Sequence, residues 1–274
     1  MAKVKLILSD IDGTILNDEN IVDSGLKQAV KQLRQKDIPF VLASARSPKG
    51  MLPIAKELDV LDNPIACYNG AFVIKNLQQQ DFTTILSHEL QVSEVQRIFE
   101  IIHQKFPQVS INLYSGADWY VGQIDKWVKI ESGITKLTPI VTDLDKLVVE
   151  HQAPIHKLLL VSEPEEIARV LQYLRDSNFA ESSFYLSKPN YLEITNSRVS
   201  KEMALRELAK TYGLTLDQTM TLGDNYNDVP MLKIAGLGVA MKNAPTDIQK
   251  CANVVTETNN QNGVSKAIEK YVLH

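Results

Sequence analysis

Near the start of this sequence of 274 residues stands the run Val4-Lys5-Leu6-Ile7-Leu8-Ser9-Asp10-Ile11-Asp12-Gly13-Thr14, with which an alternation of predicted strands and helices begins. A short apolar segment that ends in polar residues predicts a buried strand. Apolar side chains at helical spacing follow over residues 24–36, and residues 38–43 predict a second strand before a helix at 48–58. Strands and helices that alternate at this spacing predict a parallel sheet.

The same alternation returns near the C-terminus. Residues 219–222 predict a strand, 229–235 a helix and 237–241 another strand, with a last strand and helix at 254–255 and 264–272. The two ends of the chain therefore predict one α/β core, a doubly wound and mostly parallel Rossmann-like sheet.

The middle of the chain has a different pattern. Its predicted strands are longer, aromatic-rich and paired, and only two helical stretches, at 92–104 and 164–175, lie among them. We therefore predict an inserted α+β domain over residues 85–192, which divides a core formed by residues 1–84 and 193–274.

Composition excludes several classes of protein. The chain has 29 Lys+Arg against 33 Asp+Glu, a formal net charge of −4, which gives no electrostatic footprint for nucleic acid. No apolar run approaches the ~18–20 residues of a membrane span, and an aspartate at position 10 leaves no room for a signal peptide. Two cysteines are too few for a disulfide framework. We expect a cytoplasmic protein without a membrane, nucleic-acid or obligate protein partner.

The first strand ends in two aspartates, Asp10 and Asp12, separated by one residue. This places two carboxylates at the carboxyl edge of the sheet, where open α/β sheets bind ligands. Neighbouring like charges need a cation or a shared proton, and Gly13 permits a sharp turn and close backbone approach. The alternative reading is an ordinary polar turn, because Asp and Gly are common turn residues.

Three further motifs follow predicted strands or begin predicted helices. Gly223-Asp224-Asn225-Tyr226-Asn227-Asp228 offers hard oxygen ligands for Mg²⁺, although Asp and Asn also cap helices. Ser44 precedes a helix whose N-terminus favours an anion, or it simply begins that helix. Lys201 is a solvated charge by default, and only its place among the other motifs makes it a candidate phosphate ligand.

These four motifs resemble those of the haloacid dehalogenase superfamily of phosphotransferases, in its Cof-type phosphatase branch. They occur in the family's order and cover nearly the whole chain. Asn69-Gly70-Ala71 and the segment before Asn243-Ala244 also resemble family stretches. The position of the insertion is similar to that of the branch's α+β cap, which implies a lid that sets substrate specificity. Glu202 and Lys242 depart from the family pattern, since glycine is common at both positions.

The resemblance implies a Mg²⁺-dependent phosphatase that hydrolyses small phosphorylated metabolites, such as sugar phosphates, through an aspartyl-phosphate. Asp10 would be the nucleophile, and Asp12 the general acid and base. The implied metal site comprises Asp10, Asp12 through its main-chain carbonyl, Asp224 and Asp228, the last more in an orienting role. The implied phosphoryl-binding residues are Ser44, Lys201, Asn227 and Gly13.

Two other functions remain open. A phosphotransferase, such as a sugar phosphomutase, would share the aspartyl-phosphate but pass the phosphoryl group to a second hydroxyl instead of water. A catalytically inactive protein that binds a phosphorylated ligand would be expected to carry a defective motif, whereas all four motifs are complete here.

Overall fold

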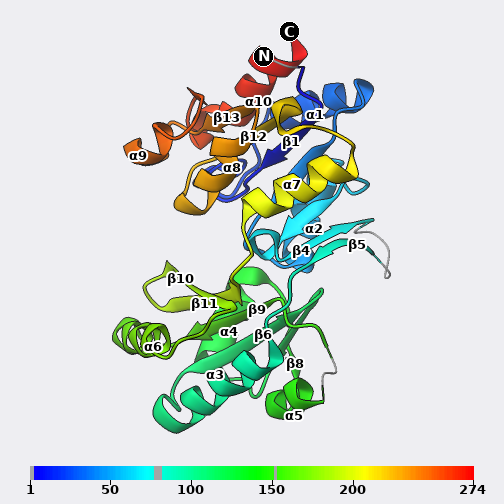
Figure 1. Ribbon diagram of the computed structural model, residues 1–274. Coiled ribbons are helices and arrows are strands. Elements are labelled where there is room, and N and C mark those ends of the chain that lie inside the picture. Colours follow the sequence, from blue (N-terminus) through cyan, green and yellow to red (C-terminus); the bar gives the residue numbers. More distant parts are fainter. Residues whose placement is uncertain (1–2, 77–81, 151–152) are drawn as a thin grey trace. The chain divides into compact units, whose positions relative to one another are not determined.

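The computed structural model describes residues 3–76, 82–150 and 153–274. It divides into two compact units (Figure 1). The first, here called the core, comprises Met1–Arg46, Met51–Leu86 and Ser200–His274, and the second, here called the cap, comprises Ser47–Gly50 and Ser87–Val199. Among the described residues, no helix combines the length and apolar character needed to cross a membrane.

The core is built on an eight-stranded sheet in the order β14-β13-β12-β1-β2-β3-β4-β5. The run of parallel pairs extends from β14 to β3, and β4 pairs antiparallel with β3. The strand bounds are Leu6–Ser9 (β1), Phe40–Ala43 (β2), Ile65–Cys67 (β3), Phe72–Lys75 (β4), Thr83–Ser87 (β5), Thr219–Gly223 (β12), Leu237–Ala240 (β13) and Val254–Val255 (β14). All four residues of β1 are buried, because helices cover both faces of the sheet.

Helices α7 and α8 lie on the face of the core sheet that is in front in Figure 1, and α1 and α2 lie behind it. The front face buries Leu6 and Leu8 against Ala204, Leu205 and Met231. The helix bounds are Leu26–Gln35 (α1), Pro48–Glu57 (α2), Lys201–Thr211 (α7), Val229–Ile234 (α8), Thr246–Gln249 (α9) and Gly263–Ile268 (α10).

The cap contains a six-stranded sheet in the order β10-β11-β9-β6-β7-β8. Its strands are Ser110–Ser115 (β6), Asp118–Val121 (β7), Ile140–Val141 (β8), Lys157–Val161 (β9), Ser182–Lys188 (β10) and Tyr191–Asn196 (β11). The pairs from β10 to β7 are antiparallel, and only β8 is parallel to its neighbour. Its helices are Val92–Lys105 (α3), Lys126–Thr135 (α4), Leu144–Val149 (α5) and Pro164–Asp176 (α6).

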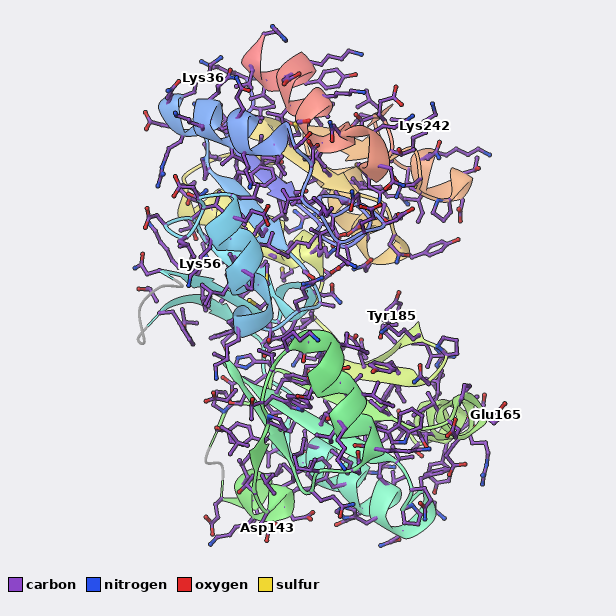
Figure 2. All side chains as sticks on the ribbon, turned by 180° about the vertical axis from the view of Figure 1, so that it is seen from behind. Lys36, Lys56, Asp143, Glu165, Tyr185 and Lys242 are labelled. Atoms are coloured by element: carbon purple, nitrogen blue, oxygen red, sulfur yellow. The ribbon has the colours of Figure 1, made fainter. Side chains whose placement is uncertain are left out.

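The two faces of the cap sheet differ in chemistry. One face buries leucines of β6, β9 and β11 under α3, α5 and α6, whereas α4 lies on the other side, in front of the sheet in Figure 2. That other face is partly polar: Asn112 is fully buried and accepts a hydrogen bond from the Trp119 indole at 3.0 Å. Tyr185, labelled in Figure 2, is 41% exposed on the edge strand β10.

The predicted fold class is confirmed: a mostly parallel α/β core is interrupted by an α+β unit. The structure divides the chain later than the predicted boundary at 192/193, because β11 continues to Asn196 as a strand of the cap sheet. The prediction also missed α4 and α5. Both begin at an aspartate whose carboxylate accepts a backbone N–H, Asp125 from Val128 and Asp143 from Lys146. Aspartates that cap a helix N-terminus in this way are easily taken for loop residues in a sequence.

The cap contains one buried histidine whose protonation opposes folding. His156 directly precedes β9 and is fully buried. Its Nδ1 accepts the Gly116 N–H at 2.9 Å, and its Nε2 lies 3.0 Å from Ser87 Oγ. Burial lowers the pKa of His156 from 6.5 to about 4. Between these two values the unfolded chain therefore binds more protons at this residue than the folded chain does.

We predict that the free energy of unfolding falls as the pH drops from 6.5 to 4, by up to about 3 kcal/mol from this one residue. Urea unfolding of the wild type and of His156→Gln, followed at several pH values, measures the effect. The variant should lose this part of the pH dependence, and His103→Gln, at an exposed position on α3, should keep it. Parallel pH profiles for the wild type and His156→Gln would contradict the prediction.

Candidate active site

The site lies at the carboxyl ends of three adjacent strands, β12, β1 and β2. After β1 the chain moves to β2 on one side, and β12 lies on the other side, so the strand order reverses at β1. Side chains that follow these strands meet at such a switch point. Asp10 follows β1, Ser44 follows β2 and Asp224 follows β12.

Lys201 is the centre of the charge cluster. Its side chain is completely buried at the first position of α7, and its ammonium group donates to the carboxylate of Asp10 and, at 2.6 Å, to Oδ1 of Asp228. Ser200 caps this helix by accepting the Met203 N–H at 3.1 Å. The Ser200 hydrogen bond fixes the start of the helix, and the two carboxylates hold Lys201 between β1 and the loop after β12.

The pKa values of these groups reflect burial first and their mutual charges second. Burial raises the pKa of Asp10 well above its usual value; Lys201 opposes this shift, and the charges of Asp228 and Asp224 add to it. Burial alone would lower the pKa of Lys201, but Asp10 and Asp228 outweigh it, and the net shift is upward. The lysine therefore stays a cation, whereas the site resists full ionisation of its acids.

Asp224 lies beside Asp10 at the end of β12. Its Oδ1 accepts the Thr14 hydroxyl at 2.7 Å, and burial raises its pKa to about 6. Gly13 is required here: its φ is +83°, and a Cβ at this position would lie 2.4 Å from Asp224 Oδ2. The main-chain oxygen of Gly13 accepts from Asn243 Nδ2 at 2.8 Å, which holds the turn in place.

Asp228 binds several donors around the loop after β12. It is fully buried, and while Oδ1 binds Lys201, Oδ2 accepts the N–H groups of Asp224 and Asn225, each at 3.0 Å. Gly223 permits this packing, since a Cβ there would lie 2.5 Å from the Asp228 side chain. Both carboxylate oxygens of Asp228 are therefore engaged by protein donors.

Asp12 is the exposed carboxylate of the site, with 53% of its side chain accessible. Arg46 binds it with two parallel hydrogen bonds, from Nε to Oδ2 at 3.0 Å and from Nη2 to Oδ1 at 2.6 Å. The Ser44 hydroxyl lies 3.4 Å from Oδ2 of the same carboxylate. A forked arginine contact of this kind orients a carboxylate as well as neutralising it.

Three acids of the site, Asp10 and Asp228, which are buried, and Asp224, which is partly buried, form a donor set suited to a hard divalent cation. One carboxylate oxygen from each of Asp10, Asp224 and Asp228 lies within 4.8 Å of the others. With Lys201 charged, three ionised carboxylates leave an uncompensated double negative charge. Oxygen ligands of this kind are what Mg²⁺ prefers, so the residues fit such an ion.

The structure brings the sequence-predicted residues of all four motifs into one region of the core. Sequence reasoning missed the partners that hold them: Arg46 on Asp12, Asn243 on Gly13, and Asn69, whose Oδ1 accepts from Asn227 Nδ2 at 3.1 Å. The only signal for Asn69 and Asn243 was that their segments resemble family stretches. Glu202 and Lys242 point to other partners, Arg206 and Glu257, and Lys242 lies at the periphery of the core in Figure 2.

Comparison with known proteins agrees with this site. The family model of the haloacid dehalogenase-like hydrolases matches residues 7–268. The chain is 33% identical to a Haemophilus influenzae protein named "Putative phosphatase", over 97% of each chain. It is 26% identical to a 5-amino-6-(5-phospho-D-ribitylamino)uracil phosphatase of Bacillus subtilis, over 98% of this chain and 96% of that one.

A solved structure gives the same result. A haloacid dehalogenase-like hydrolase from Bacteroides thetaiotaomicron superposes with a TM-score of 0.86 at 30% identity, over 98% of this chain and 99% of that one. The chain belongs to the haloacid dehalogenase-like hydrolases. Together with the names of its relatives, this membership identifies it as a phosphoric monoester hydrolase.

We predict that Lys201→Met strongly destabilises the metal-free protein, because it leaves two buried carboxylates without their shared cation. The expected loss is about 3–5 kcal/mol at pH 8, measured by urea unfolding in the presence of a chelator. The loss should shrink at lower pH, since the raised pKa of Asp10 lets that carboxyl become neutral. Lys210→Met, at the 79% exposed side chain near the end of the same helix, is the control. A loss below about 1 kcal/mol for Lys201→Met would contradict the prediction.

Proposed function

We propose that this protein is a Mg²⁺-dependent phosphatase that hydrolyses small phosphorylated metabolites through an aspartyl-phosphate on Asp10. The observation that carries the proposal is the completely buried Lys201, which joins Asp10 to Asp228 beside Asp224. A buried lysine among three carboxylates is an expensive arrangement for stability alone. It is useful where a phosphoryl group and a cation must be bound together.

Asp10 would act as the nucleophile. A carboxylate oxygen attacks phosphorus, the bond to the leaving oxygen breaks, and an aspartyl-phosphate forms; water then attacks this phosphorus and returns the free carboxylate. Covalent catalysis of this kind replaces one difficult displacement by two easier ones. Lys201 supports the role by holding the carboxylate in a single orientation and by supplying a fixed positive charge.

Asp12 would transfer protons in both half-reactions. It would donate a proton to the leaving alkoxide and later accept one from the attacking water, which is the normal reversal for one acid–base residue. Its exposure supports this assignment, since 53% of its side chain is accessible and can exchange a proton with solvent. The Arg46 fork supplies a defined position for the carboxylate between these transfers.

The phosphoryl oxygens would be bound by groups from all four motifs. Fixed donors and charges carry most of the catalysis in phosphoryl transfer, because they stabilise charge without reorganising. In our assignment these groups are the Ser44 hydroxyl, the Lys201 ammonium, the Asn227 amide and the backbone at Gly13.

Mg²⁺ would be held by Asp10, Asp224 and the main-chain carbonyl of Asp12. The ion supplies positive charge that offsets the carboxylates and polarises the phosphoryl group. Asp228 belongs to the same acidic group, but protein donors already engage both of its oxygens. We therefore assign Asp228 the task of positioning Lys201 and the Asp224 loop.

Substrate choice would reside in the cap, the unit that comprises Ser47–Gly50 and Ser87–Val199. A Bacillus subtilis relative is named as a 5-amino-6-(5-phospho-D-ribitylamino)uracil phosphatase, and this name supports a phosphorylated metabolite as substrate. We propose substrates of the same general size, sugar phosphates or similar monoesters.

We predict that Asp10→Asn lowers phosphate release about a thousandfold or more, because an amide is a poor nucleophile. The assay is release of inorganic phosphate from a panel of phosphorylated metabolites, including hexose phosphates. Asp62→Asn, at a 72% exposed ion pair with Arg34, is the matched control and should be fully active. Near-normal activity of a folded Asp10→Asn protein would overturn the nucleophile assignment. Isomerised hexose phosphate in place of free phosphate would identify a phosphotransferase.

Removal of divalent metal should abolish turnover, since the acidic cluster then lacks its compensating charge. We expect at least about a hundredfold loss in chelator and recovery on addition of Mg²⁺. Addition of Mg²⁺ should also raise the midpoint of thermal unfolding, because the ion binds only the folded site, and Asp224→Asn should weaken both effects. Activity that survives exhaustive chelation would refute the metal assignment.

A further inference from the structure

The loop between β3 and β4 has an unusual backbone. Tyr68, Asn69 and Gly70 all have positive φ, at 52°, 58° and 101°. Gly70 adopts this conformation freely and Asn tolerates it, but for a bulky residue such as Tyr68 it is strained. Strain of this kind persists only where the surroundings over-determine the backbone, and it is concentrated at functional sites. Tyr68 is fully buried, so the loop is anchored in the core.

One motif of the proposed active site, the segment from Ser44 to Arg46, binds this loop through its backbone, and a second motif packs against it. Tyr68 N–H donates to the main-chain oxygen of Arg46 at 3.1 Å, and Asn69 N–H donates to that of Ser44 at 2.8 Å. On the other side the loop packs against the N-terminus of α7. A Cβ on Gly70 would lie 2.7 Å from the main-chain oxygen of Ser200, so only glycine allows this approach beside Lys201.

The side chain of Asn69 reaches the remaining motif. Its Oδ1 accepts a hydrogen bond from Nδ2 of Asn227 at 3.1 Å. This contact commits one amide proton of Asn227 and determines which way the amide faces. This hydrogen bond also fixes the directions of the other amide proton and of the carbonyl oxygen of Asn227. A donor with a fixed direction stabilises developing charge better than a rotating one.

We propose, on the basis of the phosphatase function above, that Asn69 is a positioning residue for phosphoryl binding. It acts through Asn227, whose amide it orients, and its own backbone is tied to the segment that carries Ser44. The loop 68–70 thus joins the phosphoryl-binding residues of three separate chain segments into one rigid unit.

A purely structural role makes a different prediction. A turn that needs a left-handed residue is satisfied by glycine at least as well as by asparagine. Asn69→Gly therefore keeps the backbone and removes only the side-chain contact to Asn227. If the turn alone matters, this variant should bind phosphate and turn over substrate like the wild type.

The test is a double-mutant cycle between Asn69→Gly and Asn227→Ala in the full-length protein with Mg²⁺. Two readouts are measured: kcat/KM for phosphate release, and the inhibition constant of inorganic phosphate. In the wild-type background, Asn69→Gly should lower kcat/KM and weaken phosphate inhibition by about 3- to 10-fold, the effect of one hydrogen bond. In the Asn227→Ala background the same change should have an effect of about twofold or less.

Asn76→Gly is the matched control, because Asn76 also has a positive φ, of 64°, just after β4. It should leave both readouts unchanged, and thermal unfolding should show all variants folded. Additive effects in the cycle, or an Asn69→Gly protein with wild-type constants, would overturn the positioning role while the phosphatase function stands. An Asn227→Ala protein with wild-type constants would overturn it as well. A wild type that releases no phosphate from any ester would instead remove the proposed function itself.

Discussion

The rest of the core site depends on burying one ammonium group between two carboxylates. Lys201 is completely inaccessible, and removing such a charge from water costs several kcal/mol unless its partners are placed well. Those partners come from distant parts of the chain: Asp10 ends β1, and Asp228 lies in the loop after β12. β1 and β12 must therefore be adjacent, α7 must begin at Lys201, and the loop after β12 must close tightly on Asp228. β1 and β12 pair at the switch point of the sheet. The Ser200 side chain fixes the start of α7, and Gly223 leaves room for the loop to close on Asp228.

The same cluster bears on our proposal that an acidic protein binds a phosphate anion. The formal charge of the chain is −4, and part of it is concentrated in buried aspartates whose pKa values are raised, as for Asp10 and Asp224. Raised values mean that the folded protein holds these carboxylates in an unfavourable environment. A divalent cation relieves that cost and at the same time changes the local sign of the charge. The electrostatic strain of the cluster is thus the physical reason to expect a metal there.

Hydrogen-bond partners hold the side chains to which we assign the chemistry. Asp12 is oriented by Arg46, Asp224 by Thr14, the Gly13 turn by Asn243 and Asn227 by Asn69. A site placed on strand ends and held by such contacts keeps its geometry without substrate, which reduces the reorganisation needed during phosphoryl transfer. In contrast, the cap offers exposed side chains such as Tyr185 on an edge strand, where replacements cost little stability. This division supports our proposal that the core supplies the chemistry and the cap the choice of substrate.

The sequence by itself indicated the groups to which we assign the chemistry. An aspartate pair after an apolar strand, and an acidic loop after another, are local patterns that follow from strand periodicity and turn chemistry, so Asp10, Asp12 and Asp224 could be predicted. It did not locate α4 and α5, whose aspartate caps resemble loop residues, or the end of the cap at β11. Only the tertiary structure decided that Lys201 is buried, that Arg46 pairs with Asp12 and that Asn227 donates a hydrogen bond to Asn69. Each of these depends on two segments far apart in the chain meeting at one sheet edge, and no local pattern encodes such a distance.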